Sequence, residues 1–493
     1  MPRVGVASGS AQDHGVHARI VSSGGARHEA SALWLPRGRR YAGAMPFDFR
    51  SSPVDRAAEV SLGARGLEYR LVDTADHAAF DAWSQADNLA FHHPRPREID
   101  LEHERRVFAE RRVIGVYDST SARPDVPVAT VSSWPTGLSM PGGRSVDAWA
   151  VSSVSVAPTH RRRGIARALM EAELRDAVAA GAAVAMLTAT EATIYGRFGY
   201  SPAARAATVH VDRRRARWSG PDAPGRTHLV DPASLREIAP QLVRRAVART
   251  PGEVDRWGGL LDRVLGLVDP ESAGSRAVRA VRYDDEHGEP QGFAAYRVTR
   301  NPNEPGVLEF DFLAAATDDA ERALWRTLVE VDFVDEVRGL LRSVDEPLPW
   351  LLDDPRAIAV DHLGDHLWVR VLDPVAALGS RRFGAGGTLT LDVDDPLGYA
   401  HGVFELEVSG DGRAEVRKVE DAPDASAAGS SRRSRRAGGL RLGVRELGSI
   451  LLGDVAPSLL ARAGRVHESS AGSLEVADRL FRSARAPHLS IWF

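Results

Sequence analysis

The residues with the clearest capacity for chemistry form one run in the first half of the chain: Arg161, Arg162, Arg163, Gly164, Ile165 and Ala166. Small residues let phosphate oxygens approach the backbone closely, and arginines add positive charge. The run follows a β-branched stretch that predicts a strand through Val154, Ser155 and Val156, and it leads into a predicted helix. A helix N-terminus presents unpaired N–H groups to an anion. The pattern therefore predicts a pyrophosphate-binding loop, with a solvated basic loop or a nucleic-acid patch as the alternative.

A second candidate group follows residues 182–188, an apolar stretch that predicts a short strand. Thr190 can cap the short helix that comes next, and Tyr195 lies four residues after Glu191 on the same helical face. A tyrosine on an amphipathic turn is also typical of a hydrophobic core, so a packing role is the alternative to a chemical one.

Both segments resemble motifs of the GNAT N-acetyltransferases. The pattern R-x-x-G-x-A after a strand resembles their acyl-CoA-binding signature. The spacing Tyr195, Gly199, Tyr200 resembles the motif whose tyrosine lies near the thioester sulfur. The resemblance implies that Tyr195 protonates the departing thiolate, since phenols and thiols both have basic pKa values and the proton transfer can accompany bond cleavage.

Length and composition set limits on the kind of protein. The 493 residues leave room for about three domains, and the net charge of -4 argues against nucleic-acid binding. The absence of cysteine excludes disulfides, thiolate nucleophiles and cysteine-bound metals. His92 and His93 lack a third ligand at metal spacing, so no metal is expected. No apolar run approaches the length of a membrane span, so we expect no membrane association and a cytoplasmic location.

The chain divides into four predicted segments. Residues 1–66 are rich in Gly, Ser, Ala and Arg and predict a disordered extension, followed by regions at 67–219, 220–364 and 365–493. In the second region TDDAERALW stands where THRRRGIARALM stands in the first, which indicates a diverged repeat or, alternatively, an ordinary αβ unit. Asp318, Asp319 and Glu321 replace the arginines there and would repel a pyrophosphate. Residues 420–439 are of low complexity and predict a mobile loop.

From residue 67 to residue 493 the order of these parts resembles the enhanced intracellular survival (Eis) family of acetyltransferases. The resemblance rests on VAPTHRRRG, E-x-x-IYGRFGY, LPWLLDDPRAI, GDHLWVRVLD, ADRLF and the terminal phenylalanine. It implies an α+β fold with two tandem GNAT-like domains, at 67–219 with acetyl-CoA and at 220–364 without a CoA site, followed by a sterol-carrier-protein-like α/β domain at 365–493. It also implies a homohexamer that uses acetyl-CoA to acetylate small polyamine-like or aminoglycoside-like amines.

The family also implies a role for the last residue, because its terminal α-carboxylate reaches the active site and acts as base. Here that carboxylate belongs to Phe493, with Glu191 as a competing base. The expected acyl-CoA contacts are Val154, Ser155, Val156, Arg161, Arg162, Arg163, Gly164, Ile165, Ala166, Thr190 and Glu191. Amides of the strand at 154–156 would polarise the thioester carbonyl. Trp492 stands where an acidic residue would help bind a cation, which argues against aminoglycosides.

The third region keeps a different function open. A lipid- or sterol-binding carrier protein with a vestigial acetyltransferase domain would show the same order of parts. The intact phosphate-loop and tyrosine motifs favour the enzyme.

Overall fold

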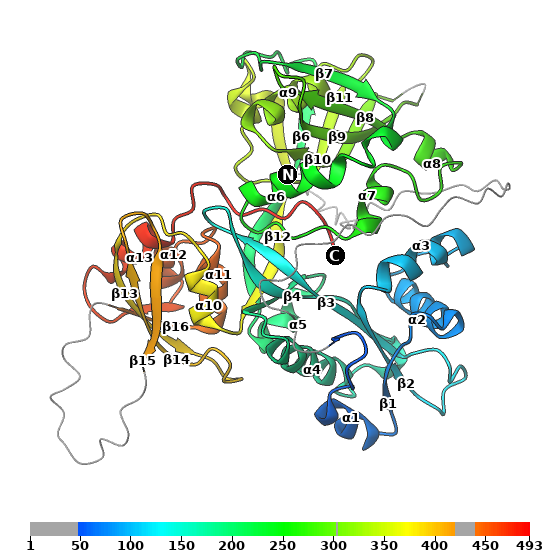
Figure 1. The fold of residues 1–493 in the computed structure, drawn as a ribbon, viewed down its shortest axis with the longest axis vertical. Helices are drawn as coiled ribbons and strands as arrows, with labels where there is room; N and C mark the ends of the chain where they lie inside the picture. Colours follow the sequence, from blue (N-terminus) through cyan, green and yellow to red (C-terminus); the bar gives the residue numbers. More distant parts are fainter. Residues whose placement is uncertain (1–47, 302–303, 420–438) are drawn as a thin grey trace, which may run out of the picture.

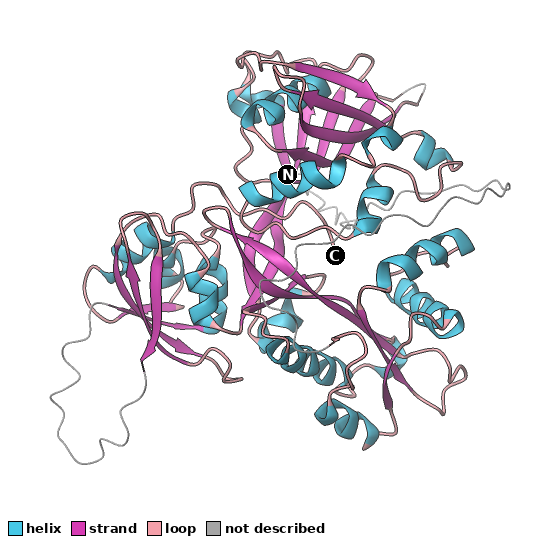
Figure 2. Ribbon diagram, viewed as in Figure 1, coloured by secondary structure: helices cyan, strands magenta, loops and turns pink. Residues whose placement is uncertain are grey.

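The structure is a computed structural model that describes residues 48–301, 304–419 and 439–493. Its main feature is a sheet of twelve strands in the order β1-β2-β3-β4-β5-β12-β6-β11-β10-β9-β8-β7, which runs through both halves of the large body (Figure 2). The strands before the centre are β1 (Glu68–Leu71), β2 (Arg112–Tyr117), β3 (Ala129–Met140), β4 (Arg144–Val156) and β5 (Val184–Thr188). The others are β6 (Ser201–Asp212), β7 (Arg226–Val230), β8 (Arg279–Asp284), β9 (Pro290–Thr299), β10 (Val307–Ala315), β11 (Glu336–Arg342) and β12 (Ile358–Val371).

Strand β12 is inserted between β5 and β6, although it comes much later in the chain. Its residues 367–371 pair antiparallel with β5, and residues 358–369 pair antiparallel with β6. The sequence predicted a boundary at residue 364 and a following strand that belongs to the third region. That boundary is wrong, because residues 365–371 complete the large sheet, and a strand's own side-chain pattern does not reveal its partner.

Helices cover both faces of the first half of the sheet. Val113 and Ile114 are neighbours on β2 and point to opposite faces. Val113 packs with Phe80 and Trp83 of α2 (His77–Ala90), which is followed by α3 (Glu98–Phe108). Ile114 shares a cluster with Leu169 of α4 (Ile165–Ala179). The predicted helix from residue 165 is therefore present, with its apolar stripe against the sheet.

Residues 48–66 of the predicted N-terminal extension are ordered. Residues 56–63 form helix α1 (Arg56–Gly63), whose buried Ala58 and Leu62 lie in the α4 cluster. Asp55 caps the helix by accepting from the N–H of Ala58 at 2.7 Å, and the same carboxylate binds Arg175 of α4. The prediction of disorder is therefore wrong for residues 48–66, since these anchors are tertiary contacts that local composition does not report. Residues 1–47 of the predicted extension lie outside the described residues.

The second half repeats the core of the first. Helix α9 (Asp318–Val329) joins the parallel strands β10 and β11, as α4 joins the parallel strands β4 and β5. Its first turn carries Asp318, Asp319 and Glu321 in place of arginines. The remaining helices of this half are α6 (Ala239–Arg249), α7 (Gly258–Val264) and α8 (Ala273–Arg276). The predicted repeat is thus present, with acidic residues at the position of the phosphate loop.

The third region has a separate sheet of five strands in the order β15-β14-β13-β16-β17. These are β13 (Gly387–Asp394), β14 (Gly402–Val408), β15 (Ala414–Val419), β16 (Gly439–Gly443) and β17 (Val466–Glu468). Its helices are α10 (Pro374–Gly379), α11 (Val444–Leu451), α12 (Pro457–Arg462) and α13 (Ser473–Phe481). All of the predicted mobile loop except its last residue, Gly439, lies outside the described residues.

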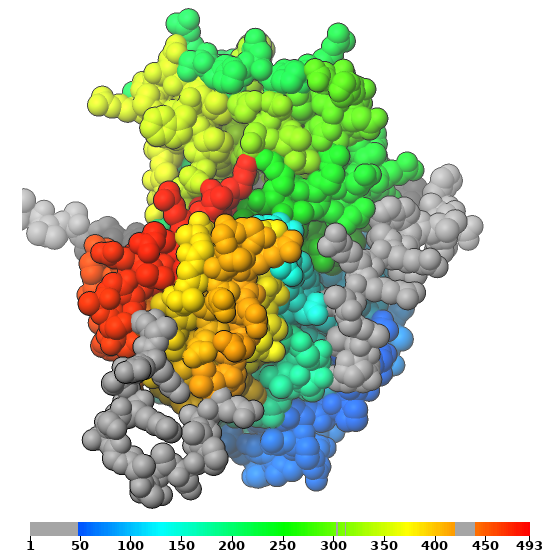
Figure 3. All heavy atoms as spheres, turned by 60° about the vertical axis from the view of Figure 1, so that its left-hand side comes forward, coloured from blue at the N-terminus to red at the C-terminus, as the bar shows by residue number. Residues whose placement is uncertain are grey.

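After α13 the chain leaves the third region. The last residues extend onto the surface of the second half, where they are red against green and yellow (Figure 3), and the chain ends between the two halves of the large sheet (Figure 1). The segment is thus placed to contribute to a site in the large body. In the described parts of the chain, no helix combines the length and apolar character needed to cross a membrane.

Candidate active site

Strands β4 and β5 separate at the centre of the first half. Their parallel pairing is recorded from Ala148 to Ala150, although β4 continues to Val156 and β5 to Thr188. Val154, Ser155 and Val156 lie on the diverging part of β4 and are half-buried. A strand edge without a neighbour offers its N–H and C=O groups to a ligand. This edge can therefore bind an extended amide chain such as the pantetheine of CoA.

A β-bulge marks the same place. The β3–β4 register shifts between Thr130 and Ser132, and Ser153 on β4 has a φ of 55°, in the left-handed region. Thr130 Oγ1 donates to the carbonyl oxygen of Ser153 at 2.7 Å and lies 2.7 Å from Ser155 Oγ. Thr130 therefore supplies a hydrogen bond to a carbonyl group that the bulge takes out of the regular β3–β4 hydrogen-bond pattern.

The predicted phosphate loop leads from β4 into α4. Arg162 and Gly164 have φ values of 62° and 75°, and successive N–H groups in such turns form an anion-binding nest. Arg161 and Arg162 are exposed beside it. Ile165 is buried and Ala166 half-buried, so these two residues can serve a phosphate through their backbone N–H groups at the start of α4.

Arg163 differs from its neighbours because protein groups hold its side chain. One guanidinium nitrogen lies 3.4 Å from Asp118 Oδ2, and another donates to the carbonyl oxygen of Arg65 at 3.2 Å. Arg65 returns the contact by donating to the carbonyl oxygen of Arg163 at 2.6 Å. The φ of 75° at Gly164 favours glycine, and a side chain there would also displace the end of the Arg65 side chain. Arg65 thus adds a cation to the loop, one that the local sequence pattern did not predict.

Tyr195 and Phe493 are both attached to the segment that follows β5. Thr188 Oγ1 donates to the terminal carboxylate of Phe493 at 2.7 Å. Thr190, two residues further on, forms a hydrogen bond with the Tyr195 phenol. Burial raises the pKa of Tyr195, so the phenol stays protonated at neutral pH. The structure therefore brings the two predicted catalytic residues to one short stretch of chain.

The predicted helix cap at Thr190 is wrong. Helix α5 (Ala192–Tyr195) has Glu191 at its N-cap position, without a capping hydrogen bond from the side chain. The hydroxyl group of Thr190 binds Tyr195 instead. Both Thr190 and Glu191 are exposed and remain accessible to a ligand.

The C-terminal segment is held by tertiary contacts. Leu489 and Ile491 are buried, as their alternation predicted. His366 Nε2 lies 2.8 Å from the carbonyl oxygen of Ile491, and the Phe493 ring packs edge-on against Trp134 with centroids 5.6 Å apart. Residues 482–493 form neither helix nor strand, so these contacts fix the position of the terminal carboxylate.

A charged group on α2 and α3 faces the bulge, and the sequence did not predict it. Asp87 of α2 forms hydrogen bonds with Ser153 and with Thr130, whose Oγ1 lies 3.3 Å from Asp87 Oδ1. Burial and the nearby Glu104 raise the pKa of Asp87 to about 7. Arg111 lies 3.8 Å from the ring centre of Trp134, and burial lowers its pKa to about 9. Helical spacing alone does not reveal which residue of α2 meets a bulge on another element.

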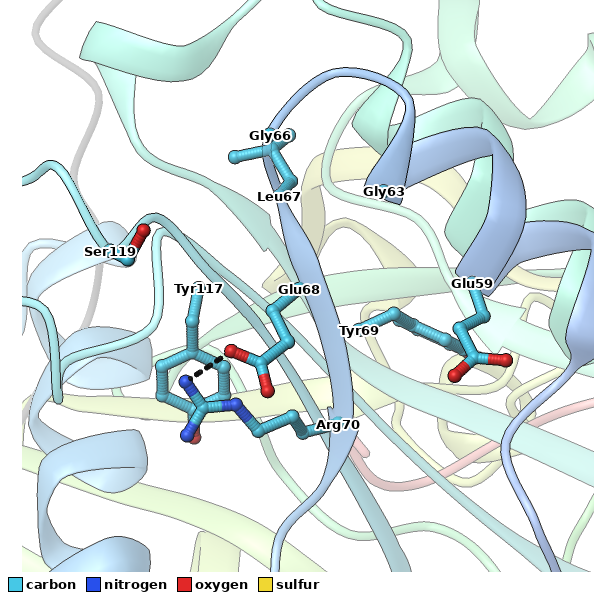
Figure 4. Close-up of a pocket in the computed structure, with 9 residues that line it drawn as sticks. All are labelled: Glu59, Gly63, Gly66, Leu67, Glu68, Tyr69, Arg70, Tyr117 and Ser119. Carbon is cyan, nitrogen blue, oxygen red and sulfur yellow. Dashed lines mark ion pairs between the residues drawn. The ribbon is translucent and has the colours of Figure 1, made fainter.

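A hollow of about 460 Å³ opens between α1, β1 and β2 (Figure 4). Figure 4 shows Arg70 over the ring of Tyr117, 4.2 Å from its centroid, and paired with Glu68. None of the predicted site residues lines this hollow. It adjoins the predicted phosphate loop, because its lining residues Gly66 and Ser119 directly follow Arg65 and Asp118, which both contact Arg163. Among the described residues, no group of His, Asp and Glu side chains is arranged to hold a metal ion.

Three parts of the chain match known domain families. Residues 71–203 and residues 252–371 each match an acetyltransferase (GNAT) domain, and residues 374–490 match a sterol carrier protein domain. These matches confirm the predicted fold class of two tandem GNAT domains followed by a sterol-carrier-protein-like domain.

Proteins with similar sequences are named as N-acetyltransferases. An uncharacterized N-acetyltransferase of Streptomyces avermitilis is 36% identical over 419 residues, which cover 82% of this chain and 94% of that protein. The N-acetyltransferase Eis of Mycobacterium tuberculosis is 34% identical over 366 residues, or 70% of this chain and 81% of Eis. The crystal structure of Eis1 from Mycobacterium abscessus matches with a TM-score of 0.70 at 30% identity, over 87% of this chain and 100% of that one. The chain therefore belongs to the Eis family of GNAT N-acetyltransferases, which are acetyl-CoA-dependent enzymes.

Proposed function

We propose that this enzyme transfers the acetyl group of acetyl-CoA directly to an amine of a small polyamine-like or aminoglycoside-like acceptor. The pyrophosphate binds the nest at Arg162 and Gly164, with Arg161 beside it, and the pantetheine pairs with the free edge of β4. Thr190 and Glu191 complete the acyl-CoA contacts at the mouth of the β4–β5 opening. The absence of cysteine supports direct attack, because no thiolate nucleophile is available for a covalent intermediate.

In the proposed mechanism Tyr195 is the acid and the terminal carboxylate of Phe493 is a base. The neutral amine attacks the thioester carbon, whose oxygen is polarised by amides of residues 154–156. Tyr195 gives its phenolic proton to the departing thiolate, and the Phe493 carboxylate accepts a proton from the amine. Glu191, at the N-cap position of α5, is the competing base.

One observation carries this proposal. The stretch from Thr188 to Thr190 hydrogen bonds both the Phe493 carboxylate and the Tyr195 phenol, beside the place where β4 and β5 separate. An acid, a base and a strand edge suited to the cofactor therefore converge at one point of the fold.

The test is CoA release from acetyl-CoA, followed with a thiol reagent across polyamines, aminoglycosides and lysine peptides. The protein contributes no thiol background, because it contains no cysteine. We expect the intact chain to release CoA in the presence of an amine. A chain lacking Phe493 should release CoA about 100-fold or more slowly, as is usual when a general base is removed. Release that does not depend on any amine would contradict the acetyltransferase proposal, and undiminished turnover by the truncated chain would contradict the role of Phe493.

A carrier function for lipids is the second candidate, favoured by the match of residues 374–490 to a sterol carrier protein domain. In that case the acetyltransferase domain would be vestigial. Lipid that copurifies with a protein unable to turn over acetyl-CoA would support the carrier; amine-dependent turnover would reject it.

We also propose that the enzyme is a cytoplasmic homohexamer, as the Eis resemblance implies. Light scattering of the purified chain tests the assembly: a mass near six times 53.2 kDa is expected, and a monomer mass would contradict it.

A further inference from the structure

Acetyl transfer to a protonated amine removes two protons from the nitrogen. At neutral pH an aliphatic amine with a pKa of about 10 is an ammonium ion. It must lose one proton before its lone pair can attack, and a second proton after the C–N bond has formed. The Phe493 carboxylate takes one of these protons in the proposed mechanism, so the other must go to solvent or to a second group of the protein.

Asp87 is the carboxylate that the fold brings to the bulge of β4. Its Oδ1 lies 3.3 Å from Thr130 Oγ1, and Ser153 forms a hydrogen bond with it as well. Thr130 in turn contacts the carbonyl oxygen of Ser153 and the hydroxyl group of Ser155, both on the predicted thioester strand. Asp87 is therefore linked through Thr130 to the strand segment that would hold the acetyl group.

The two carboxylates reach this place from different elements. Asp87 comes from α2 and contacts β3 and β4, whereas Phe493 is held by Thr188 at the end of β5. Strands β4 and β5 are paired only from Ala148 to Ala150, so one carboxylate is held beside β4 and the other at the end of β5, on the two strands that border the opening. The geometry thus provides two acceptors for two protons.

The charges around Asp87 suit a base that works near neutral pH. Burial and the carboxylate of Glu104 raise its pKa to about 7. Hydrogen bonds from Thr130 and Ser153, and more weakly the charge of Arg111, lower the pKa but do not offset this rise. Glu104 is itself held by Ser84, whose hydroxyl group donates to it at 2.5 Å. A base that is half ionised near pH 7 can take a proton from the substrate and release it to solvent in each cycle.

We propose that Asp87 accepts the first proton of the acceptor ammonium and that the Phe493 carboxylate accepts the second, an inference that rests on the proposed acetyl transfer. The electron pair of the first N–H bond stays on nitrogen and forms the C–N bond to the thioester carbon. The second N–H proton then passes to Phe493, the C–S bond breaks, and the thiolate takes the proton of Tyr195. One proton is returned to Tyr195 through solvent, and one is released.

The test uses the variant Asp87→Asn and compares two kinds of amine. The amide side chain would keep the shape of the carboxylate and an acceptor for Thr130, but it cannot take a proton. With a lysine-like amine of pKa about 10, kcat/KM at pH 7 should fall by about 100-fold. With an α-amino amide of pKa about 8, which is already partly neutral, the loss should stay below about 10-fold. At a pH of about 9.5 both losses should shrink, because solvent then removes the first proton.

Controls separate this role from a structural one. Asp81→Asn lies on the same helix, in an ion pair with Arg105, and should leave both amines unaffected. An unchanged Kd for acetyl-CoA would show that Asp87→Asn has kept the fold. An equal loss for both amines at every pH, or no loss, would overturn the proposal.

A second variant gives an independent readout. Glu104→Gln removes the like charge that raises the pKa of Asp87, so that pKa falls. Activity requires ionised Asp87, so the acidic limb of kcat/KM should move to lower pH; a limb that stays in place would count against Asp87. If the wild-type chain releases no CoA with any amine, the acetyltransferase proposal fails. If it turns over and Asp87→Asn matches it, only the role of Asp87 fails.

Discussion

Tyr195 has the properties that protonation of a thiolate requires. Its ring is buried, burial raises the pKa of its phenol, and Thr190 fixes the hydroxyl group by a hydrogen bond. A phenol with a raised pKa is fully protonated through the neutral range. The same shift makes it a weaker acid, but a thiolate formed in the same buried site would also be destabilised by desolvation and so bind a proton more strongly. The aromatic contact with Tyr200, at 6.3 Å between centroids, orients the ring from the core.

Tyr195→Phe should therefore lower kcat strongly and leave the cofactor in place. We expect a loss of about 100-fold or more in kcat, the usual contribution of a general acid. The Kd for acetyl-CoA, measured by calorimetry, should stay within about two-fold, because the ring and its packing are retained. A variant with normal kcat would show that another group, or water, protonates the thiolate.

At the scale of elements, α1 and α4 form one unit around the cofactor loop. Asp55 at the start of α1 binds Arg175 of α4 through two contacts of 2.8 Å. Beyond the end of α1, Arg65 reaches the carbonyl oxygen of Arg163. The helix thus delivers a guanidinium group to the loop that leads into α4, where a pyrophosphate would add negative charge.

Arg65→Ala should weaken acetyl-CoA binding without affecting the chemical step. One charge-assisted contact to phosphate is worth about 1.5 kcal/mol, so KM for acetyl-CoA should rise by about ten-fold with kcat nearly unchanged. Steady-state kinetics with saturating amine measure this directly. Arg56→Ala is the matched control, because Arg56 is an exposed arginine at the start of α1 that pairs with Glu59 and not with the loop. A KM that responds equally to both variants would contradict a specific role for Arg65.

These elements show which parts of the fold and the candidate site local sequence patterns could predict. The loop at residues 161–164, helix α4 and the short helix of Tyr195 were predictable, because glycine spacing and apolar periodicity act within a few residues. Helix α1, the insertion of β12 and the place of Asp87 were not, because each depends on partners far along the chain. Arg65, for example, meets Arg163 across 98 positions, and no local pattern records such a contact. Thr190 was predicted to cap the following helix, but that helix begins one residue later, with Glu191 at the N-cap position.

At the scale of the whole molecule, ion pairs join the third region to the large sheet, and one of these pairs is fully buried. Arg370 on β12 binds both oxygens of Asp395, at 2.7 and 2.8 Å, and neither side chain is more than 1% exposed. Arg205 of β6 makes a second bidentate pair with Asp454, at 2.9 Å for each contact. These pairs fix the third region against the strands at the centre of the sheet.

Asp395→Ala should be strongly destabilising, because it leaves the Arg370 guanidinium buried and unpaired. Breaking one side of a buried pair costs about 3–5 kcal/mol, which should lower the thermal unfolding midpoint measurably in scanning fluorimetry. The neighbouring Asp394→Ala is the control, since that side chain is 73% exposed and should change the midpoint little. Equal midpoints for the two variants would show that the buried pair contributes no net stability.

The insertion of β12 also affects how the chain is made on the ribosome. Roughly 170 residues separate the end of β5 from the start of β12, and synthesis of that length takes on the order of 10 s. Once β6 has been made and until β12 follows, the nascent first half lacks the strand that joins β5 to β6, so the facing edges of these two strands are open to wrong partners. A fragment that stops after β6 would keep those edges permanently. The sheet of the first half is therefore complete only after the second half has been synthesised and β12 has followed it out of the ribosome.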